Sequence, residues 1–128
     1  MSRLKVASCF LAMTAIELPA AHKPPLQRAP IEAMSRANPF EARPPQEQSA
    51  ADQAGHKLFE RECSGCHGKQ AQGSAWAPAL ASPVVKQAPA GAIFWVLRNG
   101  SLRSGMPSFA HLPEPQRWQI VTYLKNLK

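Results

Sequence analysis

Cysteine, acidic side chains and long apolar runs are all scarce in this sequence of 128 residues. There are three cysteines, which excludes a zinc site built from two cysteine pairs. Eight Asp and Glu face fifteen Lys and Arg, a formal net charge of +7. The longest uncharged apolar run, Val6 to Ile16, is shorter than the about 20 residues that span a bilayer as a helix. No alternating strand pattern is present, and the sequence therefore predicts an all-α fold.

The most informative stretch that is present is Cys63-Ser64-Gly65-Cys66-His67. It reads C-x-x-C-H, the attachment pattern of a c-type haem, in which two thiols bind the vinyl groups and the next imidazole binds iron. A thioredoxin-like dithiol would require a βαβ setting, and half a zinc site would require a second cysteine pair. A structural disulfide at this spacing would close only a tiny loop. The motif therefore predicts one covalent haem c, attached through Cys63 and Cys66 with His67 as an iron ligand.

Two segments precede the predicted haem domain. Residues 1–21 resemble a signal peptide, with a basic start, the apolar run and small residues at Ala20 and Ala21. An uncleaved helix and a lipid anchor at Cys9 are the alternatives. Export suits the motif because covalent haem attachment takes place in the periplasm or an equivalent compartment, so we expect a periplasmic protein. Residues 22–51 hold six prolines, which predicts a largely irregular linker with one helical turn at Ile31 to Arg36.

Residues 52–128 form the predicted domain, with three helix candidates. The first runs from about Asp52, a plausible N-cap, to Cys63. The second covers Ala90 to Asn99 and ends at Gly100. The third covers about Glu114 to Asn126, with prolines in its first turn. A domain this small buries little protein-only core, so the haem itself should complete it. The expected haem contacts are Phe59, Leu80, Phe94, Leu97, Trp118 and Val121. We expect the three tryptophans to serve in packing and not as electron relays.

The second axial ligand is the decisive position for function. Met106 is the only methionine after His67, and Gly105 and Pro107 place it in a loop that can present a thioether to iron. His111 is the rival ligand and would lower the reduction potential, since methionine ligation raises it. A surface role is the other interpretation of His111, because it lies at a helix entrance. We expect His67 and Met106 to be the two iron ligands.

From Gly55 to Lys128 the sequence resembles a small bacterial monohaem c-type cytochrome of the His/Met-ligated family. The matching marks, in order, are Gly55 with Phe59, the C-x-x-C-H motif, Gly-Met-Pro at Met106 and the closing Ile120-Val121-Thr122-Tyr123-Leu124. The resemblance implies a cytochrome c-like helical domain wrapped around one haem. It also implies that the Pro78 carbonyl, in Ala77-Pro78-Ala79-Leu80, accepts the N–H of His67 and orients this ligand.

An iron with both axial positions filled suits electron transfer and leaves no open site for a substrate, so we expect a carrier and not an enzyme. Residues 52–128 carry nine Lys and Arg against four Asp and Glu, a net charge of +5. This surface predicts redox protein partners with an acidic docking face, a periplasmic dehydrogenase among the candidates, steered by Lys69, Lys86, Arg98 and Arg103. We expect a monomer without a transmembrane segment and no nucleic-acid binding. The alternatives are a haem enzyme or gas sensor with a weakly ligated iron, and a cytochrome subunit of a larger dehydrogenase complex.

Overall fold

The computed structural model describes residues 25–128, and the predicted signal peptide at 1–21 lies outside them. The described chain is helical, and its only extended pairing is an isolated bridge between Ser101 and Met106. The predicted all-α fold is confirmed. The elements are η2 (Pro25–Arg28), α1 (Ile31–Met34), α2 (Pro45–Glu62), α3 (Ser64–His67), α4 (Pro83–Gln87), α5 (Ala90–Asn99), η3 (Leu102–Ser104) and α6 (Glu114–Asn126). Among the described residues, none of these helices combines the length and apolarity needed to cross a membrane.

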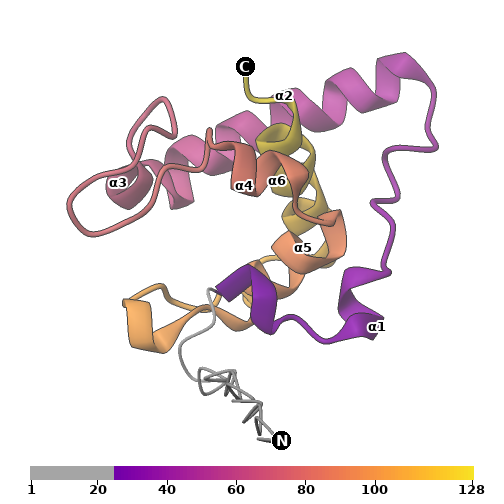
Figure 1. Cartoon of the computed structure of the whole chain (residues 1–128). Helices are drawn as coiled ribbons and strands as arrows, with labels where there is room; N and C mark the ends of the chain where they lie inside the picture. Colours follow the sequence, from indigo (N-terminus) through magenta and orange to yellow (C-terminus); the bar gives the residue numbers. More distant parts are fainter. Residues whose placement is uncertain (1–24) are drawn as a thin grey trace, which may run out of the picture.

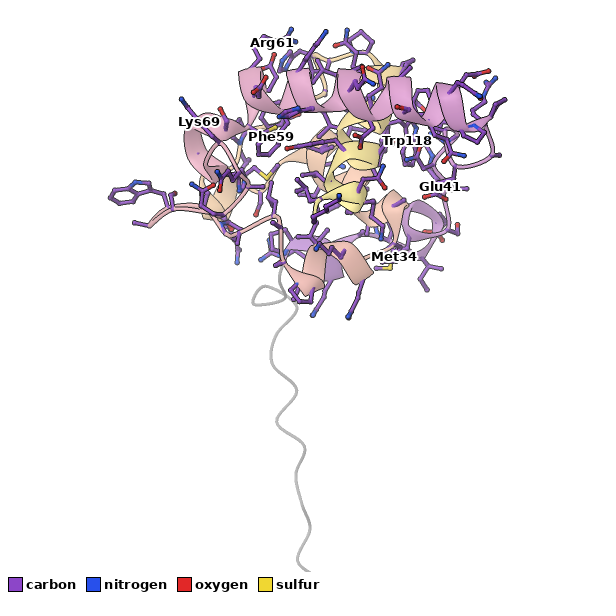
Figure 2. The ribbon with its side chains drawn as sticks, turned by 90° about the horizontal axis from the view of Figure 1, so that it is seen from above. Met34, Glu41, Phe59, Arg61, Lys69 and Trp118 are labelled. Atoms are coloured by element: carbon purple, nitrogen blue, oxygen red, sulfur yellow. The ribbon has the colours of Figure 1, made fainter. Side chains whose placement is uncertain are left out.

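Helices α2 and α6 cross at close range in the centre of the domain (Figure 1). The crossing depends on Gly55, because an added Cβ would overlap the Gln119 carbonyl oxygen and lie 2.9 Å from the Tyr123 Cβ. One turn later, Phe59 is completely buried, with its ring centroid 5.3 Å from that of Tyr123. Figure 2 shows Phe59 on the inner side of α2 and Arg61 on its outer side. The predicted pairing of a glycine and an aromatic residue at this crossing is therefore present.

Helix α5 is the most completely buried element, with six of its ten residues inside. It ends at Gly100, whose φ of 70° lies in the left-handed region that favours glycine. The short α4 before it is not among the helices that the sequence predicts. Its start is marked by Ser82, whose Oγ accepts the Val85 N–H at 3.5 Å. The end of α4 is held from α6, where the Lys125 ammonium donates to the carbonyl oxygens of Lys86 and Ala88.

Helix α2 is longer than the sequence predicts. It begins at Pro45 instead of near Asp52, so the predicted boundary between linker and domain falls inside the helix. In the sequence, the two consecutive prolines indicate an irregular segment. In the structure Pro44 is the N-cap residue and Pro45 occupies the first turn. A proline is tolerated there because backbone N–H groups in the first turn have no acceptor within the helix. Asp52 instead accepts a hydrogen bond from the Asn126 side chain at 3.0 Å.

Residues 25–44, which we call the strap, run along α5 and α6 rather than forming an undocked linker. The backbone of α1 packs directly on Gly91 of α5, where an added Cβ would overlap the Ala33 carbonyl oxygen and lie 2.9 Å from that of Arg36. Figure 1 shows α1 beside α5, with the chain then rising to the start of α2. The strap contains η2 and α1, and residues 45–51 belong to α2. Of the described part of the predicted linker, residues 29–30 and 35–44 are therefore irregular and the rest is helical.

Two polar contacts join the strap to α6. Asn38 is 3% exposed and donates from Nδ2 to Thr122 Oγ1 at 2.8 Å, while its Oδ1 accepts the Phe40 N–H at 3.1 Å. Arg36 pairs with Glu114 at 2.6 Å. The hydrogen bond from Arg36 lowers the pKa of the Glu114 carboxyl, with a smaller contribution from the Trp118 indole. The strap therefore contributes buried, specific contacts to the domain.

Replacing Asn38 with alanine should lower the free energy of unfolding by about 1–3 kcal/mol, because the buried Thr122 hydroxyl oxygen loses its donor and the half-buried Phe40 N–H loses its acceptor. Urea unfolding of the haem-loaded protein measures this. Gln27→Ala, at an exposed position of the same strap, is the matched control and should change little. Equal, small effects of both changes would show that the strap is not part of the cooperative unit.

Candidate haem site

The C-x-x-C-H motif lies where α2 ends and α3 begins. The Cys63 carbonyl oxygen accepts the backbone N–H groups of Cys66 and His67, at 3.2 and 3.0 Å, so the motif is wound into one tight turn. Both thiols are free, with Cys63 buried and Cys66 exposed. His67 is 8% exposed and belongs to the same turn. The local fold therefore presents two thiols and one imidazole from five consecutive residues.

The His67 ring is oriented by the loop that comes after it. Its Nδ1 lies 2.8 Å from the Pro78 carbonyl oxygen, the hydrogen bond that the resemblance implied. A carbonyl oxygen can only accept, so Nδ1 carries the proton and the neutral ring keeps a lone pair on Nε2. Among the described residues, no hydrogen bond to Nε2 is present. The ring is therefore prepared for one further ligand bond.

The loop from 68 to 81 is shaped by backbone bonds that bring Pro78 back to the motif. Gly73 donates to the His67 carbonyl oxygen at 2.8 Å, and Leu80 donates to that of Ala71 at 2.8 Å. Ala71 is fully buried with a φ of 56°, an uncommon conformation for a residue other than glycine. These bonds place Pro78 against His67 and leave Leu80 half-buried at the core.

The thiol chemistry of Cys63 separates the alternatives for the motif. Burial, with smaller contributions from the Glu62 carboxylate and Cys66, raises the pKa of Cys63 to about 12. A thiol of this kind stays protonated at neutral pH, whereas a redox dithiol or a metal-binding cysteine needs ready access to its thiolate. Among the described residues, no group of three metal-ligating side chains surrounds the motif either. The environment of Cys63 thus disfavours both the thioredoxin-like and the zinc interpretation.

Met106 lies in a segment that we call the Met loop, residues 100–112. Ser101 and Met106 exchange backbone hydrogen bonds of 2.9 and 3.1 Å, which close the turn around η3. The loop is also tied to the end of α5, because the Phe109 N–H donates to the Leu97 carbonyl oxygen at 2.8 Å. Met106 is half-buried against the hydrophobic core. In Figure 1 the Met loop and α3 lie on the same side of α6.

The donor set fits a c-type haem. Two free thiols, an imidazole with an unused Nε2 and a thioether in a restrained loop are the groups that such a haem requires. Of the predicted apolar contacts, Phe59, Leu97, Trp118 and Val121 are buried in the core and Leu80 packs against it.

Phe94 belongs to the same core cluster as Cys63 but has aromatic and cationic neighbours of its own. Its ring stacks on Trp118 with centroids 4.2 Å apart, and the guanidinium groups of Arg36 and Arg117 lie 4.7 and 5.0 Å from its centroid. These partners account for its burial, and its predicted haem contact rests on the sequence alone. His111 is exposed beside Phe109 and forms no hydrogen bond among the described residues, which fits the surface role.

The tryptophans differ from one another in a way the sequence does not indicate. Packing is the predicted role of all three, and Trp118 serves it at 2% exposure. Trp76 is 87% exposed, so that interpretation is wrong for this residue. Its position two residues before Pro78 places it on the loop that holds His67. The composition and spacing of the sequence do not predict that Trp76 is exposed and Trp118 is buried. This difference is seen only in the structure, from the course of the loop.

The fold and this donor set define a c-type cytochrome domain. The chain belongs to the family described as cytochrome c oxidase, cbb3-type, subunit III, whose family model matches residues 50–124. No curated protein and no solved structure matches the chain. Membership of the family makes this a haem c-binding domain with a role in electron transfer. The match begins within α2, so the strap lies outside it.

Proposed function

We propose that this protein is a periplasmic electron carrier with one haem c, bound through thioethers to Cys63 and Cys66 and ligated by His67 and Met106. The observation that carries the proposal is the His67 ring, whose Nδ1 is held by Pro78 while Nε2 remains unused. An enzymatic activity of the isolated chain is not part of the proposal, because a filled sixth position leaves no place for a substrate on the iron.

The residues of the chain have distinct tasks in this proposal. When bound, the haem supplies one-electron chemistry at its iron. Cys63 and Cys66 would hold the haem through thioethers, each the product of adding a thiol S–H across a vinyl group, which would need no oxidant or reductant. The Pro78 carbonyl keeps His67 in a single orientation. The backbone bonds of the Met loop limit the movement of Met106, which favours a small rearrangement between oxidation states.

Changing Met106 to alanine tests the sixth ligand. Oxidised wild type should show the weak absorption band at about 695 nm that marks sulfur ligation to ferric haem, and Met106→Ala should abolish it. The reduced variant should also bind carbon monoxide rapidly. Met34→Ala, in the strap, is the matched control and should keep the band. A wild type without the band would show bis-histidine ligation through His111 or an open iron, and the second result would favour a gas sensor or haem enzyme.

The electron-transfer surface should be positive and partly apolar. Of the four cations that we expect to steer docking, Lys69, Arg98 and Arg103 are exposed and Lys86 is half-buried. Exposed apolar side chains accompany them at Trp76, Val84 and Leu102. Exposed cations together with exposed apolar residues suit a transient complex with an acidic redox protein, in which charge raises the rate of association.

Reversing two of these charges should slow electron transfer to anions. For Arg98→Glu with Arg103→Glu, oxidation by hexacyanoferrate(III) at low salt should be about tenfold slower than in wild type. Oxidation by a cationic cobalt(III) complex should be faster. Lys57→Glu with Arg61→Glu makes the same charge change on α2 and is the control, with Arg61 on its outer side (Figure 2). Equal slowing by both pairs would mean that only net charge matters and would remove the local steering.

A second candidate is a cytochrome subunit of a larger respiratory complex, which the description of the family favours. Purification from its native membranes under mild conditions distinguishes the two. A carrier should be released by salt as a single small species, whereas a subunit should co-purify with the other chains of the complex.

A further inference from the structure

We propose that Arg117 is a positioning residue that holds the Met loop so that Met106 stays on the iron. This inference rests on the proposed function, because it presupposes Met106 as a ligand. Arg117 lies on α6 and is absent from the motifs that identify a c-type cytochrome by sequence. Its role emerges only from the contacts of its guanidinium group.

Arg117 is 7% exposed, and its Nη1 points at the carboxyl-terminal end of the Met loop. This nitrogen donates to the carbonyl oxygens of Leu112 at 2.9 Å and Ala110 at 3.1 Å, with that of Phe109 at 3.5 Å. The three acceptors lie shortly after Met106 and Pro107 along the chain. A single buried nitrogen, Nη1 of Arg117, therefore binds three carbonyl oxygens of the segment that follows Met106.

The charge of Arg117 has no carboxylate partner within ion-pair distance among the described residues. Its Nε is buried without any hydrogen bond. A buried cation is unfavourable unless other groups compensate for its lost hydration. Here the compensation comes from the carbonyl oxygens of the Met loop and from the Phe94 ring at 5.0 Å, with a weaker attraction to the Glu114 carboxylate beyond ion-pair distance. The loop and the cation consequently stabilise each other, and removing either leaves the other unsatisfied.

The Met loop is thus held by two anchors, both of which attach to residues that follow Met106 along the chain. The first anchor is α5, whose Leu97 carbonyl oxygen accepts the Phe109 N–H, and whose Arg98 carbonyl oxygen accepts the Ser108 hydroxyl at 2.5 Å. The second is Arg117. An iron–thioether bond is weak enough that the free energy of ordering the loop affects the fraction of time the ligand is bound. Loss of the second anchor should release Met106 more often.

Arg36 provides a matched comparison within the same molecule. Its guanidinium also lies over the Phe94 ring, at 4.7 Å, but it comes from the strap and pairs with Glu114 on the surface. Among the described residues, Arg36 has no hydrogen bond to the Met loop. A role in packing against Phe94 is therefore common to both arginines, whereas only Arg117 can restrain Met106.

The experiment compares Arg117→Gln, Arg117→Lys and Arg36→Gln as haem-loaded proteins. The pH at which half of the methionine band is lost should fall by about one unit in Arg117→Gln, and carbon monoxide should bind the reduced protein about tenfold faster. Arg117→Lys should also lower the pH of half band loss and speed carbon monoxide binding, but by less than Arg117→Gln. The lysine keeps the charge, but its ammonium cannot reproduce the geometry of the guanidinium. Arg36→Gln should lower thermal stability while leaving both readouts at the wild-type values.

The inference would be overturned if Arg117→Lys and Arg117→Gln both lose the band at the wild-type pH and bind carbon monoxide at the wild-type rate. Shifts in Arg36→Gln as large as those in the Arg117 variants would also overturn it. If Arg117→Gln fails to fold, Arg117→Lys carries the test by itself. Absence of the band from wild type would instead refute Met106 ligation and thus the proposed function. A band that is present in wild type, lost in Met106→Ala and unchanged in both Arg117 variants would refute only the role of Arg117.

Discussion

A Gly55→Ala variant should be strongly destabilised. The added Cβ would overlap the Gln119 carbonyl oxygen, lie 2.6 Å from its carbonyl carbon and 2.9 Å from the Tyr123 Cβ. Two of these three neighbours are backbone atoms, so α2 and α6 must separate instead of repacking a flexible side chain. Overpacking of this kind costs about 1–3 kcal/mol, and here the upper end or more is expected because the crossing is rigid. Thermal unfolding of the haem-loaded variant measures the loss.

Gly65→Ala is the matched control for this change. Gly65 lies in α3 between the two cysteines, and an added Cβ there meets nothing within 4 Å. Since alanine also favours the helix over glycine, the control should be neutral or slightly stabilising. If Gly55→Ala unfolds at the same temperature as Gly65→Ala, the close crossing of α2 and α6 does not exist in solution.

Removing both thiols, with Cys63→Ala and Cys66→Ala together, should abolish covalent attachment of the haem. The mass of the purified variant should equal that of the polypeptide alone, and acidified organic solvent should extract any haem that remains. Because a domain of this size buries little apolar surface without the haem, far-ultraviolet circular dichroism should show a large loss of helix. Each single variant should keep one thioether and most of its helical structure.

The two single variants are also informative because their sites differ. Cys63 is buried in the core cluster, whereas Cys66 is exposed, so Cys63→Ala should destabilise the protein more than Cys66→Ala. The double variant should be less stable than either. A double variant that retains the wild-type mass with haem would contradict attachment through this motif.

Much of the helical structure could be predicted because its signals are local. α5 and α6 have the predicted bounds, Ala90–Asn99 and Glu114–Asn126, since Gly100 and Pro113 end and begin them by their own conformational preferences. The predicted start of α2 is wrong for a related reason. A proline pair indicates a break in the chain, but whether the second proline opens a helix depends on the residues after it and on the packing of that helix.

The strap and the anchoring of the Met loop could not be predicted from local patterns. Asn38 and Thr122 are 84 positions apart, and Arg36 and Glu114 are 78 apart. Neither residue of such a pair carries a signal for its partner. Arg117 likewise resembles any other cation of an amphipathic helix until its acceptors, the carbonyl oxygens of Ala110 and Leu112, are seen.

The sequence by itself determined the chemistry of this protein. The spacing of Cys63, Cys66 and His67 is a local property, because these side chains must act from a single turn of the chain. The tertiary structure decided which groups support that chemistry. The Pro78 carbonyl on His67 and the Arg117 contacts to the Met loop join residues only 11 and 5 positions apart, but they depend on the course of loops that no local pattern specifies. Burial of Cys63 in the core and the close crossing of α2 and α6 at Gly55 depend on distant segments meeting, which the chain achieves only when it folds as a whole.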